Sequence, residues 1–239
     1  MMNLTNEQRT ALYQHLLQHP FKLDDTFRFR CTACGKCCKD RQDILLSPYD
    51  LNRMARYLRV EMGELIQTYC VCHEGCSSHL PVVTLDMRGQ QKKCPFLERK
   101  KCRIHAAKPT VCALFPLGRV GSEDHDSVQY ILQDVDCGDR DEEHSVREWL
   151  GVYGLEESEI WFNAWNKATV TLAKRMNPLA EKLTAGVMNP ILQGLLVTLY
   201  VQYDMEKDFM EQFIKNVQKA NEMLDGVDAL VNAAGTLIK

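Results

Sequence analysis

The chain has 239 residues, a net charge of −3 and 45% hydrophobic residues, which is typical of a globular protein with one large or two small domains. The longest apolar run, residues 195–201, is too short to span a bilayer, and the first twenty residues lack the pattern of a signal peptide. No block of like charge indicates nucleic-acid binding. We therefore expect a cytoplasmic protein with no membrane span and no nucleic-acid partner.

Short helices and strands are predicted through the first part of the chain. Apolar residues three and four apart indicate helices, and runs of β-branched residues indicate strands. The clearest start signal is Ser47, because Pro48 follows it at the first helical position. The predicted helices span residues 4–19, 47–58, 61–69 and 144–155. The predicted strands span residues 43–46, 80–87, 102–105 and 128–135.

From Glu156 onward the pattern is almost entirely helical. Pro178 and Pro190 each follow an asparagine that can cap a helix, so we expect them to separate helices. Residues 204–224 have one amphipathic face. The predicted fold class is α+β, with an irregular cysteine-rich metal-binding domain of short strands and helices over residues 1–150. An all-α helical lobe follows over residues 151–239 and offers a surface for a protein partner.

All eleven cysteines lie between Cys31 and Cys137. In a reducing compartment, clustered cysteines bind metal or carry out redox chemistry more often than they form disulfides. The spacing Cys31-x2-Cys34-x2-Cys37, with the flexible Gly35 inside it, allows a tight turn to aim thiolates at one ion. The eight cysteines predicted as metal ligands are Cys31, Cys34, Cys37, Cys38, Cys94, Cys102, Cys112 and Cys137.

The spacing leaves both an iron–sulfur cluster and zinc open. A CxxCxxC run with a remote Cys-Pro, here Cys94-Pro95, is typical of [4Fe–4S] ligation, whereas CxxCG is typical of a zinc knuckle. Iron–sulfur is slightly favoured. Adjacent residues of an extended segment point to opposite faces, so we expect Cys37 and Cys38 to face separate ions. Eight cysteines then predict two four-thiolate centres or one larger cluster.

The segments CTACGKCC (31–38), CPFLERKKCRIHAAKPTVCALFPLG (94–118) and DCG (136–138) together resemble the CxxCxxCC family of zinc- or iron-chelating proteins. The resemblance covers about residues 28–150 and implies that the cysteines bind metal. The family includes flagellin lysine methylases, which supply an enzymatic precedent. This sequence departs from the family pattern by His105 in place of an aromatic residue, Lys108 in place of an arginine, and Ala113 in place of another arginine.

The remaining cysteines, Cys70, Cys72 and Cys76, lie outside the family pattern, with His73 and His79 nearby. They are compatible with a further zinc site, with thiols that line the main site, or with unreactive thiols. His105 stands three residues after Cys102, which is ligand spacing. Because an aromatic residue is usual at that position in the family, a packing role is the preferred interpretation.

Three functions remain open from the sequence. The leading one is a metal-binding protein whose iron–sulfur or zinc cluster organises the fold. The others are a cluster-dependent protein-modifying enzyme, such as a lysine methyltransferase, and an interaction module with structural zinc; whether the protein is an enzyme is undecided. Because a structural zinc contributes about 10–16 kcal/mol, we expect chelation or Cys34→Ser to unfold the first 150 residues.

Overall fold

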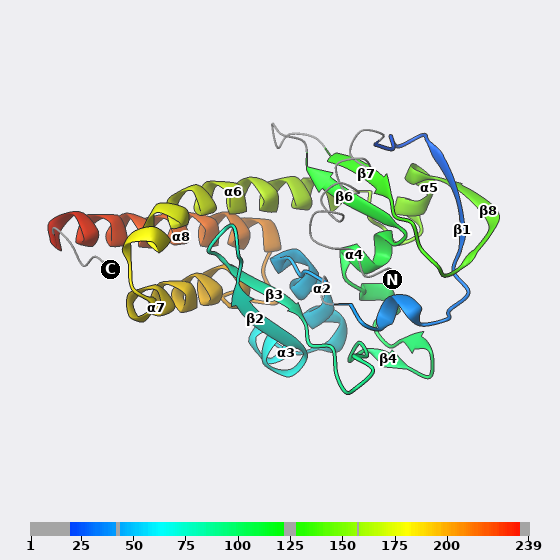
Figure 1. Cartoon of the computed structure of the whole chain (residues 1–239), viewed down its shortest axis with the longest axis horizontal. Helices are drawn as coiled ribbons and strands as arrows, with labels where there is room; N and C mark the ends of the chain where they lie inside the picture. The colour runs from blue at the N-terminus through cyan, green and yellow to red at the C-terminus, as the bar shows by residue number, and fades with distance from the viewer. Residues whose placement is uncertain (1–19, 42–43, 122–127, 157, 235–239) are drawn as a thin grey trace. The chain divides into compact units, whose positions relative to one another are not determined.

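The computed structural model describes residues 20–41, 44–121, 128–156 and 158–234 (Figure 1). The chain divides into two compact units, each built from two separate stretches. The described residues of 20–41 and 88–164 form what we call the cysteine unit, and those of 44–87 and 165–234 form the helical unit. The residue ranges of the compact units therefore differ from those of the two domains predicted on either side of residue 150. That these two domains fold independently stays a prediction.

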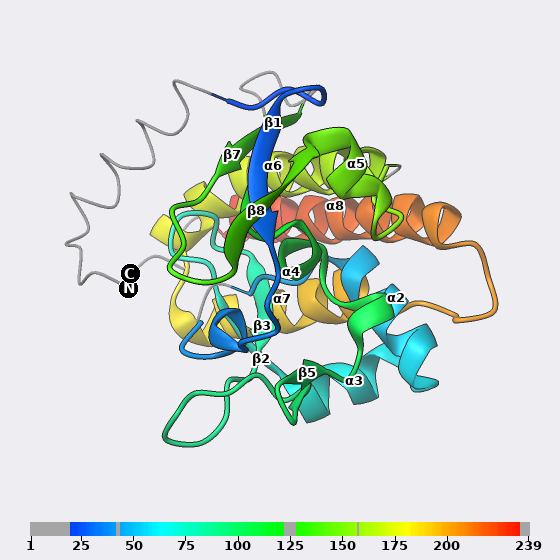
Figure 2. The same cartoon turned by 90° about the vertical axis from the view of Figure 1, so that its right-hand side faces the viewer.

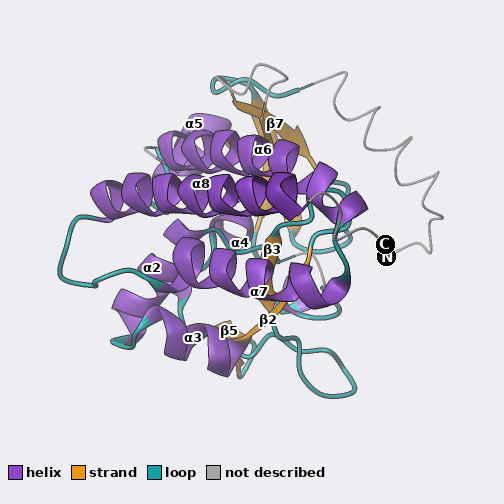
Figure 3. Ribbon diagram, turned by 90° about the vertical axis from the view of Figure 1, so that its left-hand side faces the viewer, coloured by secondary structure: helices purple, strands orange, loops and turns teal. Residues whose placement is uncertain are grey.

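The described elements are helices and short strands, which confirms the α+β class (Figure 3). The α-helices are α2 (Pro48–Leu58), α3 (Met62–Tyr69), α4 (Thr110–Leu114), α5 (Val146–Gly151), α6 (Ser158–Lys182), α7 (Ala185–Leu196) and α8 (Phe209–Ala234). Shorter helical turns are η1 (Lys36–Cys38), η2 (His105–Ala107) and the π-helix η3 (Val197–Val201). The strands are β1 (Thr26–Arg30), β2 (Cys70–Glu74), β3 (Pro81–Leu85), β4 (Leu97–Glu98), β5 (Lys101–Cys102), β6 (Leu117–Gly121), β7 (Val128–Leu132) and β8 (Asp139–Ser145).

The strands pair only in antiparallel twos: β1 with β8, β2 with β3, β4 with β5, and β6 with β7. A two-stranded ribbon is marginal by itself and needs an apolar face to pack on. In the cysteine unit the rings of Phe27 and Phe29 meet Trp149 edge-on, at centroid distances of 5.6 and 5.9 Å. The Trp149 Nε1 donates to the Leu114 carbonyl at 3.0 Å. This aromatic core fixes β1, β8, α4 and α5 together (Figure 2).

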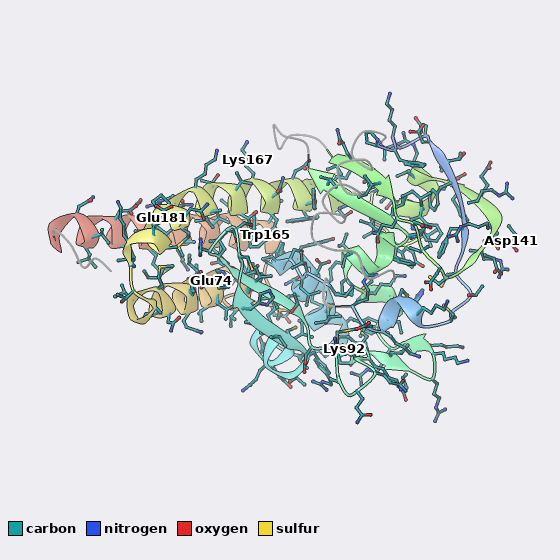
Figure 4. All side chains as sticks on the ribbon, viewed as in Figure 1. Glu74, Lys92, Asp141, Trp165, Lys167 and Glu181 are labelled. Carbon is teal, nitrogen blue, oxygen red and sulfur yellow. The ribbon has the colours of Figure 1, made fainter. Side chains whose placement is uncertain are left out.

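The helical unit packs α2, α3, α6, α7 and α8 with the β2–β3 hairpin. Trp165, labelled on α6 in Figure 4, meets the ring of Tyr200 edge-on at 5.4 Å. The Tyr200 hydroxyl donates to the Pro81 carbonyl at 3.2 Å. Arg175 of α6 binds Asp225 and Asp228 of α8 at 2.7 and 2.8 Å. No helix in the described part of the chain combines the length and apolar character that a membrane crossing needs.

Several predicted elements are confirmed near their predicted bounds. Helices α2 and α3 match the predictions for 47–58 and 61–69, and Ser47 is the N-cap of α2 with a full capping box to Asp50. Strands β3 and β7 lie inside the predicted strands 80–87 and 128–135. The predicted helix over 144–155 is shorter, since α5 ends at Gly151. The predicted helix over 4–19 lies outside the described residues.

Other predictions were wrong for local reasons. Pro178 lies inside α6 and Pro190 inside α7, and the helices separate instead at Thr184, which is the N-cap of α7. Of the predicted strand 43–46 the structure describes residues 44–46, which form an isolated bridge from Leu45 to Thr84 and no named strand. The predicted strand 102–105 stops at Cys102 because a 3-10 turn, η2, follows it. The predicted amphipathic helix 204–224 begins only at Phe209, and α8 continues past it.

Candidate metal centre

The loop that carries the first four cysteines is a tight turn, not an extended strand. Ala33 and Gly35 have positive φ angles of 52° and 71°, and the Cys38 amide donates to the Gly35 carbonyl at 3.2 Å. The turn η1 places the Sγ atoms of Cys37 and Cys38 only 3.9 Å apart. The premise that Cys37 and Cys38 lie in an extended segment is therefore wrong, because a 3-10 turn does not alternate its side chains as a strand does. That they bind separate ions stays a prediction.

A backbone ladder brings Cys94 to the first loop. The Cys94 amide donates to the Cys38 carbonyl at 2.9 Å, and the Asp40 amide donates to the Lys92 carbonyl at 2.9 Å. Between these bonds Lys39 and Lys93 form an antiparallel bridge. Residues 56 positions apart in sequence are thus neighbours, which no local spacing rule reveals.

Cys94 and Cys102 are brought together by the β4–β5 hairpin. The Leu97 amide donates to the Cys94 carbonyl at 3.0 Å, and Leu97 pairs with Cys102 across the hairpin. The Arg103 amide donates to the Phe96 carbonyl at 2.8 Å, and Phe96 is 1% exposed. A buried phenylalanine therefore anchors the hairpin and holds both cysteines at its base.

Cys112 lies in the middle of the short helix α4. The helix starts directly after Pro109, whose carbonyl accepts hydrogen bonds from the amides of Cys112 and Ala113, both at 2.9 Å. Ala113 and Leu114 are buried in the aromatic core of the unit. The helix thus turns its apolar residues into the core, and the Cys112 thiol interacts electrostatically with those of Cys94 and Cys102.

Cys137 is held beside Cys31 by the β1–β8 ribbon. Arg30, the last residue of β1, pairs with Asp139, so Cys31 and Gly138 follow at the same end of the ribbon. Gly138 has a φ of 71°, and a Cβ there would lie 2.4 Å from Phe29 and 2.7 Å from the Arg30 carbonyl oxygen. Only glycine fits this close approach. Lys36 adds a second link, because its Nζ donates to the Asp136 carbonyl at 2.9 Å.

The thiols interact electrostatically as one connected group. A hydrogen bond with Cys38 lowers the pKa of Cys37 to about 6 against the opposing effect of burial, and it raises the pKa of Cys38. Burial is the main cause that raises the pKa of Cys94, Cys102 and Cys112, and a thiolate at Cys37 adds to each of these shifts. Burial, followed by the charges of Cys34 and Cys37, raises the pKa of Cys137 to about 11.

Cys37 is therefore the common member of two sets of thiols. It interacts with Cys38, Cys94, Cys102 and Cys112 on one side, and with Cys137, which also contacts Cys34, on the other. Cys31 follows Arg30 directly, at the same end of the β1–β8 ribbon as Cys137. All eight predicted ligand positions belong to the cysteine unit, and seven of their thiols are linked by these electrostatic interactions. Their role as ligands stays a prediction.

The donor set fits a thiophilic metal. All eleven cysteines are free thiols, and the 3.9 Å between Cys37 and Cys38 is close to the edge of a tetrathiolate site, about 3.8 Å for Zn–S bonds of about 2.3 Å. Among the residues that the structure describes, no three His, Cys, Asp or Glu side chains already stand as a closed site. Binding an ion would therefore require the cysteine side chains to move closer together around it.

Comparison with known proteins agrees with this arrangement. Residues 30–138 match the CxxCxxCC family model, described as "Putative zinc- or iron-chelating domain". This segment is a CxxCxxCC domain. An uncharacterised protein of Methanocaldococcus jannaschii is 31% identical over 90 residues, which are 37% of this chain and 44% of that protein. The chain thus matches less than half the length of this relative, and no solved structure is significantly similar.

Lys108 provides a positive charge at the position where the family pattern has its first arginine. The Lys108 Nζ lies 3.8 Å from the ring centroid of Tyr153, and its charge lowers the pKa of Cys37, Cys102 and Cys112. A positive charge next to the thiols favours their thiolate forms. Lys108 therefore supplies the electrostatic effect that an arginine would supply, without its bidentate geometry.

At the position of the second arginine of the family pattern this chain has Ala113. Ala113 is 1% exposed, in the core, and leaves no charge at its position. Arg41, which sequence reasoning missed, is 6% exposed, lies 5.9 Å from the ring of Phe115 and also lowers the pKa of Cys37. Its only sequence signal is its position three residues after Cys38, which does not reveal burial.

His105 packs against an aromatic ring, and the three remaining cysteines belong to the helical unit. His105 meets the ring of Tyr153 edge-on at 5.7 Å, which agrees with the packing interpretation. Cys70 and Cys72 lie two residues apart on β2, and Cys76 follows in the turn after it. All three belong to the helical unit. Burial, with the charges of Cys72 and Asp86, raises the pKa of Cys70 to about 12.

Proposed function

We propose that the CxxCxxCC domain binds metal through one connected thiolate cluster, and that this cluster organises the cysteine unit. The observation that carries the proposal is the position of Cys37, whose thiol interacts with both sets of cysteines. Seven of the eight predicted ligand thiols, from six separate elements or loops, are linked electrostatically. Of the two arrangements predicted from the sequence, one larger cluster is better supported than two four-thiolate centres, because the Sγ atoms of Cys37 and Cys38 lie 3.9 Å apart.

The metal is zinc or the iron of an iron–sulfur cluster. The CxxCxxC run and Cys94-Pro95 favour iron–sulfur, whereas the Sγ separation of Cys37 and Cys38 favours a tetrahedral thiolate site. When bound, either metal would accept thiolate electron pairs and cross-link β1, η1, the β4–β5 hairpin and α4. No feature among the described residues specifically favours a methyltransferase, so the enzymatic alternative remains only a family precedent.

The test is metal analysis of protein purified without oxygen. We expect bound zinc, or iron and sulfide with visible absorption that dithionite bleaches. Cys112→Ser and Cys137→Ser remove one thiol from each set, and both should lose most of the metal. Cys76→Ser, in the helical unit, is the matched control and should keep it. Wild-type protein without stoichiometric metal after anaerobic reconstitution, or equal losses in all three variants, would contradict the proposal.

Metal affinity should depend strongly on pH. The pKa of Cys94, Cys102, Cys112 and Cys137 is raised, so these thiols are protonated at neutral pH and must release protons to bind metal. Competition titration with a chelator should show affinity that rises from pH 6 to pH 8. Because Cys37, with its pKa near 6, releases its proton first, it should supply the first ligand. Affinity independent of pH would contradict thiol ligation.

A further inference from the structure

Exposed cations gather on two turns next to the thiol cluster. Residues 88–103 contain seven Lys or Arg and one acidic residue, Glu98, which gives a net charge of +6. The whole chain has a net charge of −3, so its other residues carry −9. The sequence shows no continuous basic block because Cys94-Pro95-Phe96-Leu97 interrupts the charges. In the fold these charges stand on two turns that flank this segment, one before Cys94 and the other the β4–β5 hairpin, and Lys39 joins the first turn through its bridge to Lys93.

The first turn places like charges opposite each other. Lys93 forms a bridge with Arg88, with reciprocal backbone hydrogen bonds of 2.8 Å, and a second bridge with Lys39. Like charges directly opposite in a ladder destabilise it. Uncharged residues such as threonine would pair better at these positions. The fold therefore retains an electrostatic cost here that a bound anion would remove.

The second turn is also unfavourable for its fold. Arg99 and Lys100 join β4 to β5 and have positive φ angles of 46° and 66°. A two-residue hairpin turn with both φ angles positive prefers Asn-Gly, and a side chain with positive φ is strained by about 1 kcal/mol. Both residues and the neighbouring Lys101 are exposed. Stability of the turn does not explain why three successive cations stand here.

Five of these cations, Lys92, Lys93, Arg99, Lys100 and Lys101, are weakly paired or form no ion pair among the described residues. Lys92, labelled in Figure 4, lies 3.5 Å from Asp40, and both side chains are largely exposed, so the pair contributes little. Within the described ranges, Lys93, Arg99, Lys100 and Lys101 form no ion pair. Figures 1 and 2 show both turns at the lower edge of the views. We call Lys39, Arg88, Lys92, Lys93, Arg99, Lys100 and Lys101 the basic platform.

We propose that the basic platform binds an acidic segment of a partner protein. The platform offers no aromatic side chain for base stacking, because Phe96 is 1% exposed and sits under Arg103 at 5.6 Å. Single-stranded nucleic acid relies on such stacking. A short run of Asp or Glu matches the platform in charge, and would be steered to it.

The platform shares its hairpin with the thiol cluster. Cys94 follows the first turn directly, and Cys102 follows Lys101. A partner bound on the platform would therefore lie next to the proposed metal centre. The proposal does not depend on metal binding, because the platform charges belong to lysine and arginine side chains that are not among the predicted metal ligands.

The test uses a fluorescein-labelled deca-glutamate peptide as the probe and full-length protein with its metal. Fluorescence anisotropy should show binding at low ionic strength that weakens with added salt. The combined variant Arg99→Glu, Lys100→Glu and Lys101→Glu should lower the affinity at least about tenfold. The matched control Lys174→Glu, Lys215→Glu and Lys219→Glu makes the same charge change on exposed positions of the helical unit, and its affinity should stay within about threefold.

Other outcomes would overturn the proposal. One is wild-type protein that does not bind the peptide, and another is equal weakening by the two triple variants. Tighter binding of a DNA duplex of equal charge would assign the platform to nucleic acid instead. A salt-sensitive dimer that the platform variant dissociates, seen by sedimentation, would assign it to a second copy of this chain. Metal content unchanged in both triple variants would show that the platform and the thiol cluster act separately, as proposed; metal lost only from the platform variant would contradict that separation.

Discussion

Single residues in the cysteine unit position the thiols through the backbone. Gly35 allows the left-handed turn that leads into Cys37 and Cys38, and Gly138 allows the segment after Cys137 to pass against Phe29. At Gly35 the nearest atoms to an added Cβ are 3.7 Å away, so only the backbone angle requires glycine. At Gly138 both the angle and the space require it, which makes Gly138 the more demanding position.

Gly138→Ala should destabilise the cysteine unit by about 3 kcal/mol, the sum of a left-handed alanine and a clash with the buried Phe29 ring. Gly89→Ala is the control, because Gly89 has the same φ of 71° but nothing within 4 Å of an added Cβ. That variant should cost about 1 kcal/mol. Urea denaturation of both variants measures the difference. Equal destabilisation would show that close packing at Gly138 contributes nothing.

At the level of elements, capping decides where several helices begin. Ser47 and Ser145 each accept a hydrogen bond from the third helical residue, Asp50 or Glu148, whose carboxylate accepts one in return. The hydrogen bonds with Ser145 lower the pKa of Glu148. Both boxes are readable from sequence as Ser followed three residues later by an acid. Caps therefore predicted α2 well, whereas prolines predicted breaks in α6 and α7 that do not occur.

The two capping boxes allow a matched test of the two compact units. Ser145→Ala removes the cap of α5 in the cysteine unit, and Ser47→Ala removes that of α2 in the helical unit. Each should cost about 1 kcal/mol. Hydrogen–deuterium exchange should speed up around α5 in the first variant and around α2 in the second. Faster exchange of both helices in both variants would mean that the units unfold together.

At the level of the whole molecule, the chain leaves the cysteine unit after Arg41 and returns at Arg88. The CxxCxxCC domain, residues 30–138, thus includes a stretch that packs in the helical unit. A family match along the sequence does not define a compact unit. The eight predicted ligand cysteines nevertheless all come from the two stretches of the cysteine unit, on either side of this excursion.

Metal removal should therefore act on the cysteine unit and spare the helical unit. After incubation with a strong chelator under anaerobic conditions, we expect exchange protection to fall in β1, β8 and α4. Protection in α2, α3, α7 and α8 should persist, because their contacts lie in the other unit. This refines the sequence expectation that the whole of residues 1–150 unfolds. Loss of protection in α2 and α3 to the same degree would restore that expectation, and no loss anywhere would refute a structural role for metal.

The sequence alone predicted the thiol chemistry that we propose for this protein. The spacing of the cysteines, the Ser47 cap and the amphipathic pattern of the last long helix are local signals, because a turn, a cap or a helix face depends on residues within a few positions of each other. The α+β class and the match to a zinc- or iron-chelating family follow from such signals. They also predicted the eight ligand cysteines, all of which lie in the cysteine unit.

Only the tertiary structure decided how those thiols meet. Three features depend on contacts between residues far apart in sequence. They are the backbone hydrogen bond from the Cys94 amide to the Cys38 carbonyl, the strand register that sets Cys137 beside Cys31, and the burial of Arg41. The same holds for the basic platform, whose charges are separated by apolar residues along the chain. Long-range pairing is set by the packing of the whole core, and a pattern read over a few residues does not contain it.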